Sequence, residues 1–215
     1  MSHVHSAGEN ASAGKRPTTV VFDLGGVLLR WEPHRAFEDV LAPDQVQPFL
    51  DEVDFAEWNH RHDAGGRFAD GVFELTQRFP HHAEAIAAYP RNHHLTITGQ
   101  MDETVALVDE LAERGVRLLA LTNWSAETFP WARRTFPVLQ RFEAIVVSGE
   151  EGVAKPDLRL YRILLDRYDV TASEAVFVDD RQVNVDAARQ VDMHGVLFTD
   201  APALQGELRS LGLLG

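Results

Sequence analysis

The amino-acid sequence predicts an α/β fold in which a doubly wound parallel sheet carries a small inserted helical cap. Five short runs are apolar at almost every position, as expected of strands that are buried on both faces. Amphipathic helical patterns stand between these runs, and the order strand, helix, strand implies right-handed crossovers within one sheet. The five runs are residues 19–22, 116–121, 144–147, 175–178 and 196–198.

Two helices of the predicted core have a clear pattern. In residues 102–114 the apolar side chains recur at three- and four-residue spacing, and Gly115 stands where a glycine commonly ends a helix. Residues 158–168 repeat the pattern with leucine and tyrosine. Both helices have one apolar face, so we expect them to pack against the sheet.

Residues 33–98 separate the first strand from the second by far more chain than a single crossover helix needs. We predict that they form a helical cap. Because this segment follows the first strand directly, the cap would hang over the C-terminal end of that strand and could close over it. Its helical stretches are residues 49–58, 68–79 and 83–88, separated by Gly65-Gly66 and Pro80.

Residues 1–17 are rich in Ser, Ala and Gly, and we predict a disordered tail rather than a signal peptide or a membrane span. The core then comprises residues 18–32 and 99–215, and a cytoplasmic location is the default expectation. With 20 basic and 33 acidic residues the net charge is −13, which argues against a nucleic-acid-binding protein. The absence of cysteine excludes disulfides and thiol chemistry. The oligomeric state stays open between monomer and homodimer.

Polar residues follow four of the five predicted strands. They are Asp23, Thr122-Asn123, Lys155-Pro156 and Asp179-Asp180. Because ligands of open parallel sheets bind outside the carboxyl ends of the strands, we expect these side chains to share one site. Each signal alone has a plainer interpretation: Asp23 could begin a turn, Lys155 could be a surface lysine, and Asp179-Asp180 could cap the next helix.

The predicted carboxylates favour a divalent cation. Mg²⁺ prefers hard oxygen ligands, and a bound cation offsets the repulsion between carboxylates at one sheet edge. An acidic protein with an anionic substrate also needs local positive charge. We therefore expect a divalent cation at this edge of the sheet.

This set of motifs resembles the haloacid dehalogenase-like hydrolases, on the stretches 20–27, 121–123, 153–156 and 177–180. The resemblance implies a Rossmann-like core, Mg²⁺ as cofactor, and a phosphatase that acts on a small phosphorylated molecule through an aspartyl-phosphate. The catalytic residues would be the nucleophile Asp23 and the phosphate-binding Thr122 and Lys155. Asp23, Asp179, Asp180 and the backbone carbonyl of Gly25 would hold the metal, and Gly26, Asn123 and Trp124 would bind substrate.

The first motif, Asp-Leu-Gly-Gly-Val, departs from most phosphatases of this family. They carry a second Asp two residues after the nucleophile as general acid and base, where this chain has Gly25. The form with glycine resembles a subgroup of bacterial phosphatases, some of which act on sugar phosphates. We hypothesise that the substrate has a good leaving group, or that Glu32 or a cap histidine supplies the acid.

Two other functions stay open at this point. The first is a 2-haloacid dehalogenase, in which the aspartate attacks carbon without a metal. The second is a catalytically silent binding protein that keeps the fold. Both are less consistent with the sequence, because Gly25 and the pair Asp179-Asp180 do not suit a dehalogenase and a silent protein needs no buried carboxylates.

The cap residues carry weaker signals. Trp58, Arg61 and His62 could contact substrate, although Trp58 is more typical of a cap core and the charged residues of a solvated face. The pairs His81-His82 and His93-His94 are interpreted as surface residues, because adjacent positions on a helix do not face one another.

Overall fold

A computed structural model describes residues 16–215, so almost all of the tail predicted at residues 1–17 lies outside the described residues. A five-stranded parallel sheet in the order β5-β4-β1-β6-β7 forms the centre of the molecule. The doubly wound α/β fold is therefore confirmed. The strands are β1 (Thr19–Phe22), β4 (Arg117–Thr122), β5 (Ala144–Val147), β6 (Ala175–Asp179) and β7 (His194–Leu197).

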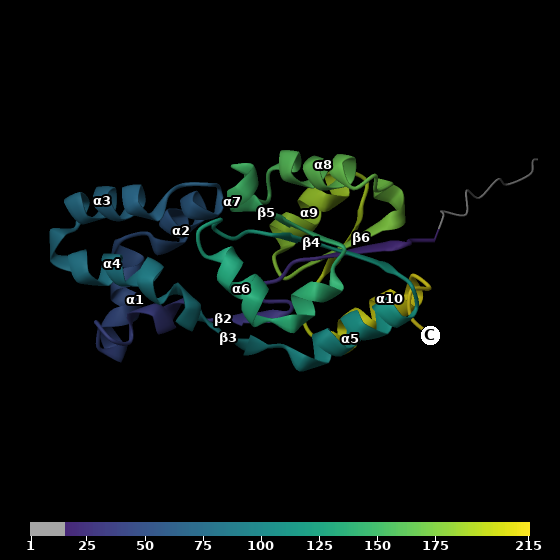
Figure 1. Ribbon diagram of the computed structural model, residues 1–215, viewed down its shortest axis with the longest axis horizontal. Coiled ribbons are helices and arrows are strands. Elements are labelled where there is room, and N and C mark those ends of the chain that lie inside the picture. Colours follow the sequence, from purple (N-terminus) through teal and green to yellow (C-terminus); the bar gives the residue numbers. More distant parts are fainter. Residues whose placement is uncertain (1–15) are drawn as a thin grey trace, which may run out of the picture.

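Helices cover both faces of this sheet (Figure 1). Residues of α5 and α10 pack with Val20 and Phe22 in one buried cluster, and residues of α8 and α9 pack with Val21 in a second. Successive residues of β1 thus point to opposite faces, which explains why its apolar run does not alternate with polar residues. The helices are α5 (Asp102–Glu113), α6 (Phe129–Thr135), α7 (Ser148–Glu151), α8 (Leu158–Arg167), α9 (Gln182–Gln190) and α10 (Ala201–Ser210).

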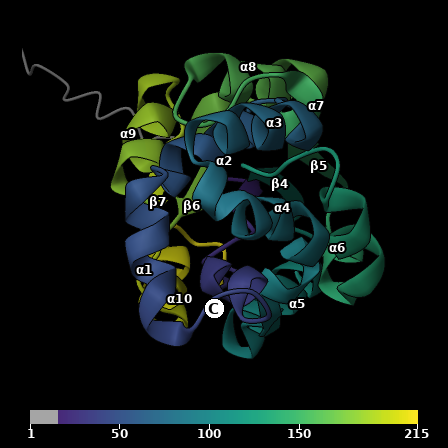
Figure 2. The same cartoon turned by 90° about the vertical axis from the view of Figure 1, so that its left-hand side faces the viewer.

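The segment between β1 and β4 is mostly helical and lies at one end of the molecule (Figure 1). Figure 2, seen from that end, shows these helices in front of the sheet. Their buried side chains form a separate cluster around Phe37, Trp58 and Tyr89. We call this segment, residues 33–96, the helical insertion. Its α-helices are α1 (Pro43–Glu52), α2 (Phe55–Asp63), α3 (Phe68–Arg78) and α4 (Ala83–Asn92), with 3₁₀ segments η1 (Pro33–Phe37), η2 (Pro80–His82) and η3 (His93–Thr96).

Two features of this segment differ from the sequence prediction. The helical stretch predicted at residues 49–58 is two helices, because the chain turns at Asp54, which has a left-handed backbone conformation with φ 52°. The second is an antiparallel pair, β2 (Leu29–Trp31) with β3 (Ile97–Gln100), where the chain enters and leaves the insertion. These strands have only three and four residues, too few for a periodic signal.

None of the helices in residues 16–215 has the length and apolarity that a membrane crossing requires.

Candidate active site

Asp23 is the first residue after β1 and marks the centre of the candidate site. Its backbone N–H donates to the carbonyl of Val178 at 2.8 Å, which continues the pairing of β1 with β6. The carboxylate accepts the N–H of Leu24 at 2.7 Å and is largely buried. The chain then turns at Gly26, which has φ +77° and therefore favours glycine. The strand and the turn together fix a carboxylate at the sheet edge.

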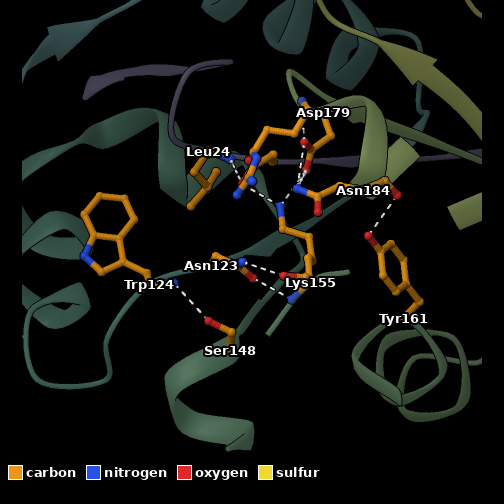
Figure 3. Close-up of polar contacts among 10 residues, drawn as sticks. Leu24, Asn123, Trp124, Ser148, Lys155, Tyr161, Asp179 and Asn184 are labelled. Carbon is orange, nitrogen blue, oxygen red and sulfur yellow. Dashed lines mark hydrogen bonds and ion pairs between the residues drawn. The ribbon is translucent and has the colours of Figure 1, made fainter. Parts of the chain in front are cut away.

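Lys155 joins Asp23 to Asp179 (Figure 3). Its Nζ lies 2.9 Å from Oδ1 of Asp23 and 2.7 Å from Oδ2 of Asp179, and its side chain is completely buried. Burial alone would lower the pKa of Lys155, but the two carboxylates outweigh it and the pKa is raised. The ammonium is therefore charged and held at the sheet edge.

Asp179 is fully buried and well supplied with hydrogen bonds. Besides Lys155, it accepts the backbone N–H of Arg181 at 2.8 Å and the side-chain amide of Asn184 at 3.0 Å. Helix α9 follows Arg181 without any side-chain cap, so capping of this helix does not account for the Asp179-Asp180 pair. The contacts instead fix the carboxylate that orients Lys155.

Asn123 holds the loop that carries Lys155. Its side-chain oxygen accepts the N–H of Lys155 at 2.8 Å, and its side-chain NH₂ donates to the carbonyl of Lys155 at 3.0 Å (Figure 3). The next residue, Trp124, donates its backbone N–H to Ser148 at 2.9 Å. Asn123 thus positions Lys155 through the main chain, a role that sequence reasoning did not assign to it.

Three carboxyl groups lie at this edge, and Lys155 supplies one positive charge to balance them. Burial, and to a smaller extent Asp179, raise the pKa of Asp23 to about 7, although Lys155 opposes the shift. The pKa of Asp180 is raised by burial and by Asp179. Carboxylate oxygens of Asp23, Asp179 and Asp180 lie within 4.8 Å of one another. Such a set of hard, mutually repelling oxygens fits a divalent cation such as Mg²⁺.

Gly26 makes the position of Asp180 possible. A Cβ at Gly26 would lie 2.3 Å from Oδ2 of Asp180, so any side chain there would displace that carboxylate. We expect Gly26→Ala to weaken Mg²⁺ binding by about tenfold or more, a change of about 1.4 kcal/mol, measured by calorimetry. Gly115→Ala is the matched control, because Gly115 has a similar φ of +75° but open space around it. Equal Mg²⁺ affinity of wild type and Gly26→Ala would contradict this assignment of Asp180.

A cavity of about 410 Å³ opens between the sheet edge and the helical insertion. The sheet side contributes Asp23, Gly25, Gly26, Asn123, Trp124, Lys155, Asp180, Arg181 and Asn184. The other side consists of Trp31, Ala56, Asn59, His60, Asp63, Tyr89 and His93. Of the residues predicted for the site, Thr122 and Asp179 do not line the cavity: Thr122 lies buried at the end of β4, and Asp179 lies behind Lys155.

The three cap residues that the sequence suggested as substrate contacts do not line this cavity. Trp58, Arg61 and His62 line a second cavity of about 280 Å³ within the insertion. Trp58 is part of the buried cluster and donates its indole N–H to the carbonyl of Gly71 at 3.2 Å. His62 is buried against Phe68, and burial lowers its pKa. The cap-core interpretation of Trp58 thus agrees with its position.

The surface interpretation of the histidine pairs is wrong in part. His94 is exposed, but His93 is buried and lines the larger cavity, because η3 turns it inward between Tyr89 and Trp124. His81 and His82 lie in a 3₁₀ segment, where both rings can reach one partner, and their Nε2 atoms lie 3.0 and 3.1 Å from the carboxylate of Glu52. The helix geometry assumed from the sequence does not apply there.

Glu32 does not reach the cavity. Its carboxylate accepts hydrogen bonds from Arg35 at 3.1 Å and from Thr98 at 3.1 Å, and the hydrogen bond from Arg35 lowers its pKa despite some desolvation. A carboxylate that is ionised and does not line the cavity cannot serve as the acid there. The prediction that Glu32 supplies the acid is therefore wrong.

Comparisons with known proteins agree with this geometry. The profile of a family described as haloacid dehalogenase-like hydrolase matches residues 17–192. Over 196 residues the chain is 32% identical to a sesquiterpene phosphatase of Aspergillus oryzae, covering 89% of this chain and 94% of that protein.

Two solved structures share the fold. An enzyme of the same family from Bacteroides thetaiotaomicron superposes with a TM-score of 0.67 at 16% identity, over 86% of this chain and 95% of that one. It has also been solved in complex with magnesium and inorganic phosphate. An L-2-haloacid dehalogenase from Xanthobacter autotrophicus matches with a TM-score of 0.61 at 18% identity, over 90% of this chain and 83% of that one. At these identities the likeness shows the fold alone.

Proposed function

The chain belongs to the haloacid dehalogenase-like hydrolase family, and we propose that within it this protein is a Mg²⁺-dependent phosphatase for a small phosphorylated metabolite. The observation that carries the proposal is the buried Lys155 ammonium between Asp23 and Asp179, with the carboxylate of Asp180 beside them. A phosphate that enters the cavity meets a nucleophile and a fixed positive charge at one point.

Asp23 is the nucleophile in this proposal. Its carboxylate attacks phosphorus and forms an aspartyl-phosphate, which water then hydrolyses. Lys155 binds the phosphate oxygens as a point charge. Thr122, which the sequence suggested as a second phosphate ligand, is buried at the end of β4 and does not line the cavity, so the proposal gives it no contact with phosphate. Asp179 is a positioning residue, because it contacts Lys155 from behind the cavity wall.

The metal would be held by Asp23, Asp180 and the backbone carbonyl of Gly25, with Asp179 in support. When bound, Mg²⁺ offsets the charge between the two anions that must meet and polarises the phosphoryl oxygens. The raised pKa of Asp23 supports this assignment, because a nearby divalent cation would return that carboxylate to the ionised form needed for attack.

The cavity suits a substrate with an apolar part. Trp31, Tyr89 and Trp124 present aromatic surface to it, while Gly26 and Asn123 would flank the phosphate end. Its volume of about 410 Å³ is within the ordinary range for small-molecule sites. The sesquiterpene phosphatase among its relatives supports an isoprenyl monophosphate as one candidate, beside the sugar phosphate that the first motif suggests.

A dehalogenase is the less favoured function. Attack on carbon needs no divalent cation, and a site for it would gain nothing from a third carboxylate beside Lys155. The aspartates around Lys155 support the phosphatase instead.

Phosphate release from a panel of monophosphates tests the proposal. The panel contains a hexose 1-phosphate, a linear alkyl phosphate, an isoprenyl phosphate and para-nitrophenyl phosphate, each with Mg²⁺ or with a chelator. We expect turnover that the chelator abolishes and that Mg²⁺ restores. Release of halide from a 2-haloacid without metal, and no phosphate from any ester, would overturn the phosphatase and favour the dehalogenase.

A further inference from the structure

The proposed reaction lacks a proton donor for the leaving group, and this inference rests on that proposed function. Displacement at phosphorus places the attacking and leaving oxygens roughly in line, on opposite sides. Because Asp23 attacks from the sheet edge, the leaving oxygen points toward the helical insertion. Gly25 carries no acid, so a donor must lie on the insertion side of the cavity.

Asp63 is the carboxyl group of the insertion that lines this cavity. It is the last residue of α2 and is partly buried. Its Oδ2 accepts the side-chain amide of Asn59 at 3.1 Å, and the backbone N–H of Ser125, in the loop after β4, interacts with its carboxylate. Asn59 in turn accepts the hydroxyl of Tyr89 at 2.8 Å. Asp63 is thus fixed from both sides of the cavity.

The contact between Asp63 and Ser125 joins the helical insertion to the core. A second contact spans the same gap, since Glu127 accepts the backbone N–H of Phe68 at 2.8 Å. Helix α2 also contacts α7 of the core. The position of Asp63 over the site therefore depends on the packing of the insertion against the loop after β4.

We propose that Asp63 is the general acid and base of this enzyme and replaces the acid that is absent at Gly25. In the first step the carboxylate of Asp23 forms a bond to phosphorus, the bond from phosphorus to the leaving oxygen breaks, and the proton of Asp63 passes to that oxygen. In the second step the Asp63 carboxylate takes a proton from the attacking water. The aspartyl-phosphate bond breaks, inorganic phosphate leaves, and Asp63 is protonated again.

The titration of Asp63 is consistent with this role. Burial, and then the nearby charge of Asp23, raise its pKa to about 7, while Lys155 and the Ser125 N–H oppose the shift. The charged groups of the core that line the cavity with Asp63 are Asp23, Lys155, Asp180 and Arg181. The titratable groups of the insertion that line it are His60, Tyr89 and His93. An acid with a pKa near the working pH can both give and recover a proton.

The two histidines of the cavity differ in what they can donate. Burial lowers the pKa of His93 to about 4, so this imidazole is neutral at pH 7 and holds no acidic proton comparable to that of Asp63. His60 lies on α2 with Asp63, so the variant His60→Gln separates the contributions of the two residues.

The test uses full-length Asp63→Asn with saturating Mg²⁺ and substrates that differ in leaving group. For an alkyl phosphate, whose alkoxide must be protonated, we expect kcat/KM to fall by about 10²–10⁴-fold. For para-nitrophenyl phosphate, whose leaving group needs no proton, we expect little change in kcat/KM, because this ratio reports formation of the phosphoenzyme. The kcat should fall on both substrates, because hydrolysis of the phosphoenzyme needs the base in either case. Wild-type kcat/KM for the alkyl phosphate should fall as the pH rises above about 7, because Asp63 then loses its proton. This descending limb should be absent in the variant.

Restoring an acid in the core provides a rescue. A Cβ at Gly25 meets no atom within 4 Å, so Gly25→Asp fits sterically. On the alkyl phosphate we expect kcat/KM of the double variant Gly25→Asp, Asp63→Asn to be at least about tenfold higher than that of Asp63→Asn alone. This is a fraction of the usual gain from general acid catalysis. A structural role of Asp63 would not be rescued in this way.

Two controls complete the experiment. Asp70→Asn removes a carboxyl group that lines the second cavity instead, and should have no effect. His60→Gln should not show the selective loss, and if it does while Asp63→Asn does not, His60 is the acid and the proposal fails. An equal loss of kcat/KM on the alkyl phosphate and on para-nitrophenyl phosphate, without rescue by Gly25→Asp, would also overturn the proposal. Inactivity of wild type on every phosphate would instead be a failure of the proposed phosphatase.

Discussion

Asp23→Asn is expected to abolish turnover, with kcat reduced by at least about 10⁴-fold on every phosphate that the wild type hydrolyses. The amide has nearly the shape of the carboxylate but cannot form the acyl-phosphate. Lys155 would keep its contact with Asp179 at 2.7 Å, so the phosphate-binding charge remains in place. Steady-state phosphate release and mass spectrometry of the trapped phosphoenzyme are the measurements.

Without metal at neutral pH, the free energy of unfolding of Asp23→Asn should be no lower than that of the wild type. Burial raises the pKa of Asp23 from 3.8 to about 7, so folding favours its protonated form. The stability that depends on this proton is fully present below the pKa of the unfolded state, 3.8. It is lost as the pH rises through the pKa of the folded state, about 7. A neutral Asn removes that penalty at pH 7 to 8. If the folded Asp23→Asn variant still hydrolyses phosphate esters and still forms a phosphoenzyme, Asp23 is not the nucleophile.

Lys155→Met is expected to cause the largest loss of stability, about 3–5 kcal/mol at pH 7 without metal. Methionine can occupy much of the space of the lysine stem, but it leaves the buried carboxylates of Asp23 and Asp179 without their shared ammonium. Phosphate hydrolysis should also be lost, because the charge that binds phosphate is gone. Urea unfolding at several pH values measures the effect.

The pH dependence of this loss has a definite sign. In Lys155→Met the carboxyl group of Asp23, whose pKa burial raises to about 7, can become neutral by protonation, so the deficit in unfolding free energy should shrink from pH 8 to pH 5. Added Mg²⁺ should shrink it as well. Arg141→Met is the matched control: it breaks the exposed pair with Asp109, for which about 0–1 kcal/mol is expected. A deficit that is equal at all pH values would mean that lost packing, and not unpaired charge, causes it.

The sequence was sufficient for the sheet because its strands are buried on both faces. Val20, Val21 and Phe22 are all inaccessible to solvent, and this is what made the run before Asp23 continuously apolar. The ribbon formed by β2 and β3 was missed because Arg30 and Trp31 are exposed and the strands are very short. Its pairing connects residues 29–31 with residues 97–100, and no local pattern reports such a contact.

His93 and Asp63 show a second limit on what the sequence pattern can predict, namely which side chains line the cavity. Both were visible in the sequence as members of polar clusters, and nothing in their spacing separated them from their exposed neighbours His94 and Arg61. Which of two adjacent residues faces a cavity depends on the exact phase and end of a helix. A local change to a 3₁₀ turn is enough to reverse it.

By itself the sequence determined the fold class and the convergence of Asp23, Lys155 and Asp179. Strands that alternate with helices along the chain imply a parallel sheet, and parallel strands bring their carboxyl ends to one edge. Only the tertiary structure decided that Asn123 holds the Lys155 main chain and that Asp63 meets the Ser125 N–H across the cavity. These contacts join segments that are distant in the chain, and they arise from the packing of the insertion on the core, which no local pattern of residues encodes.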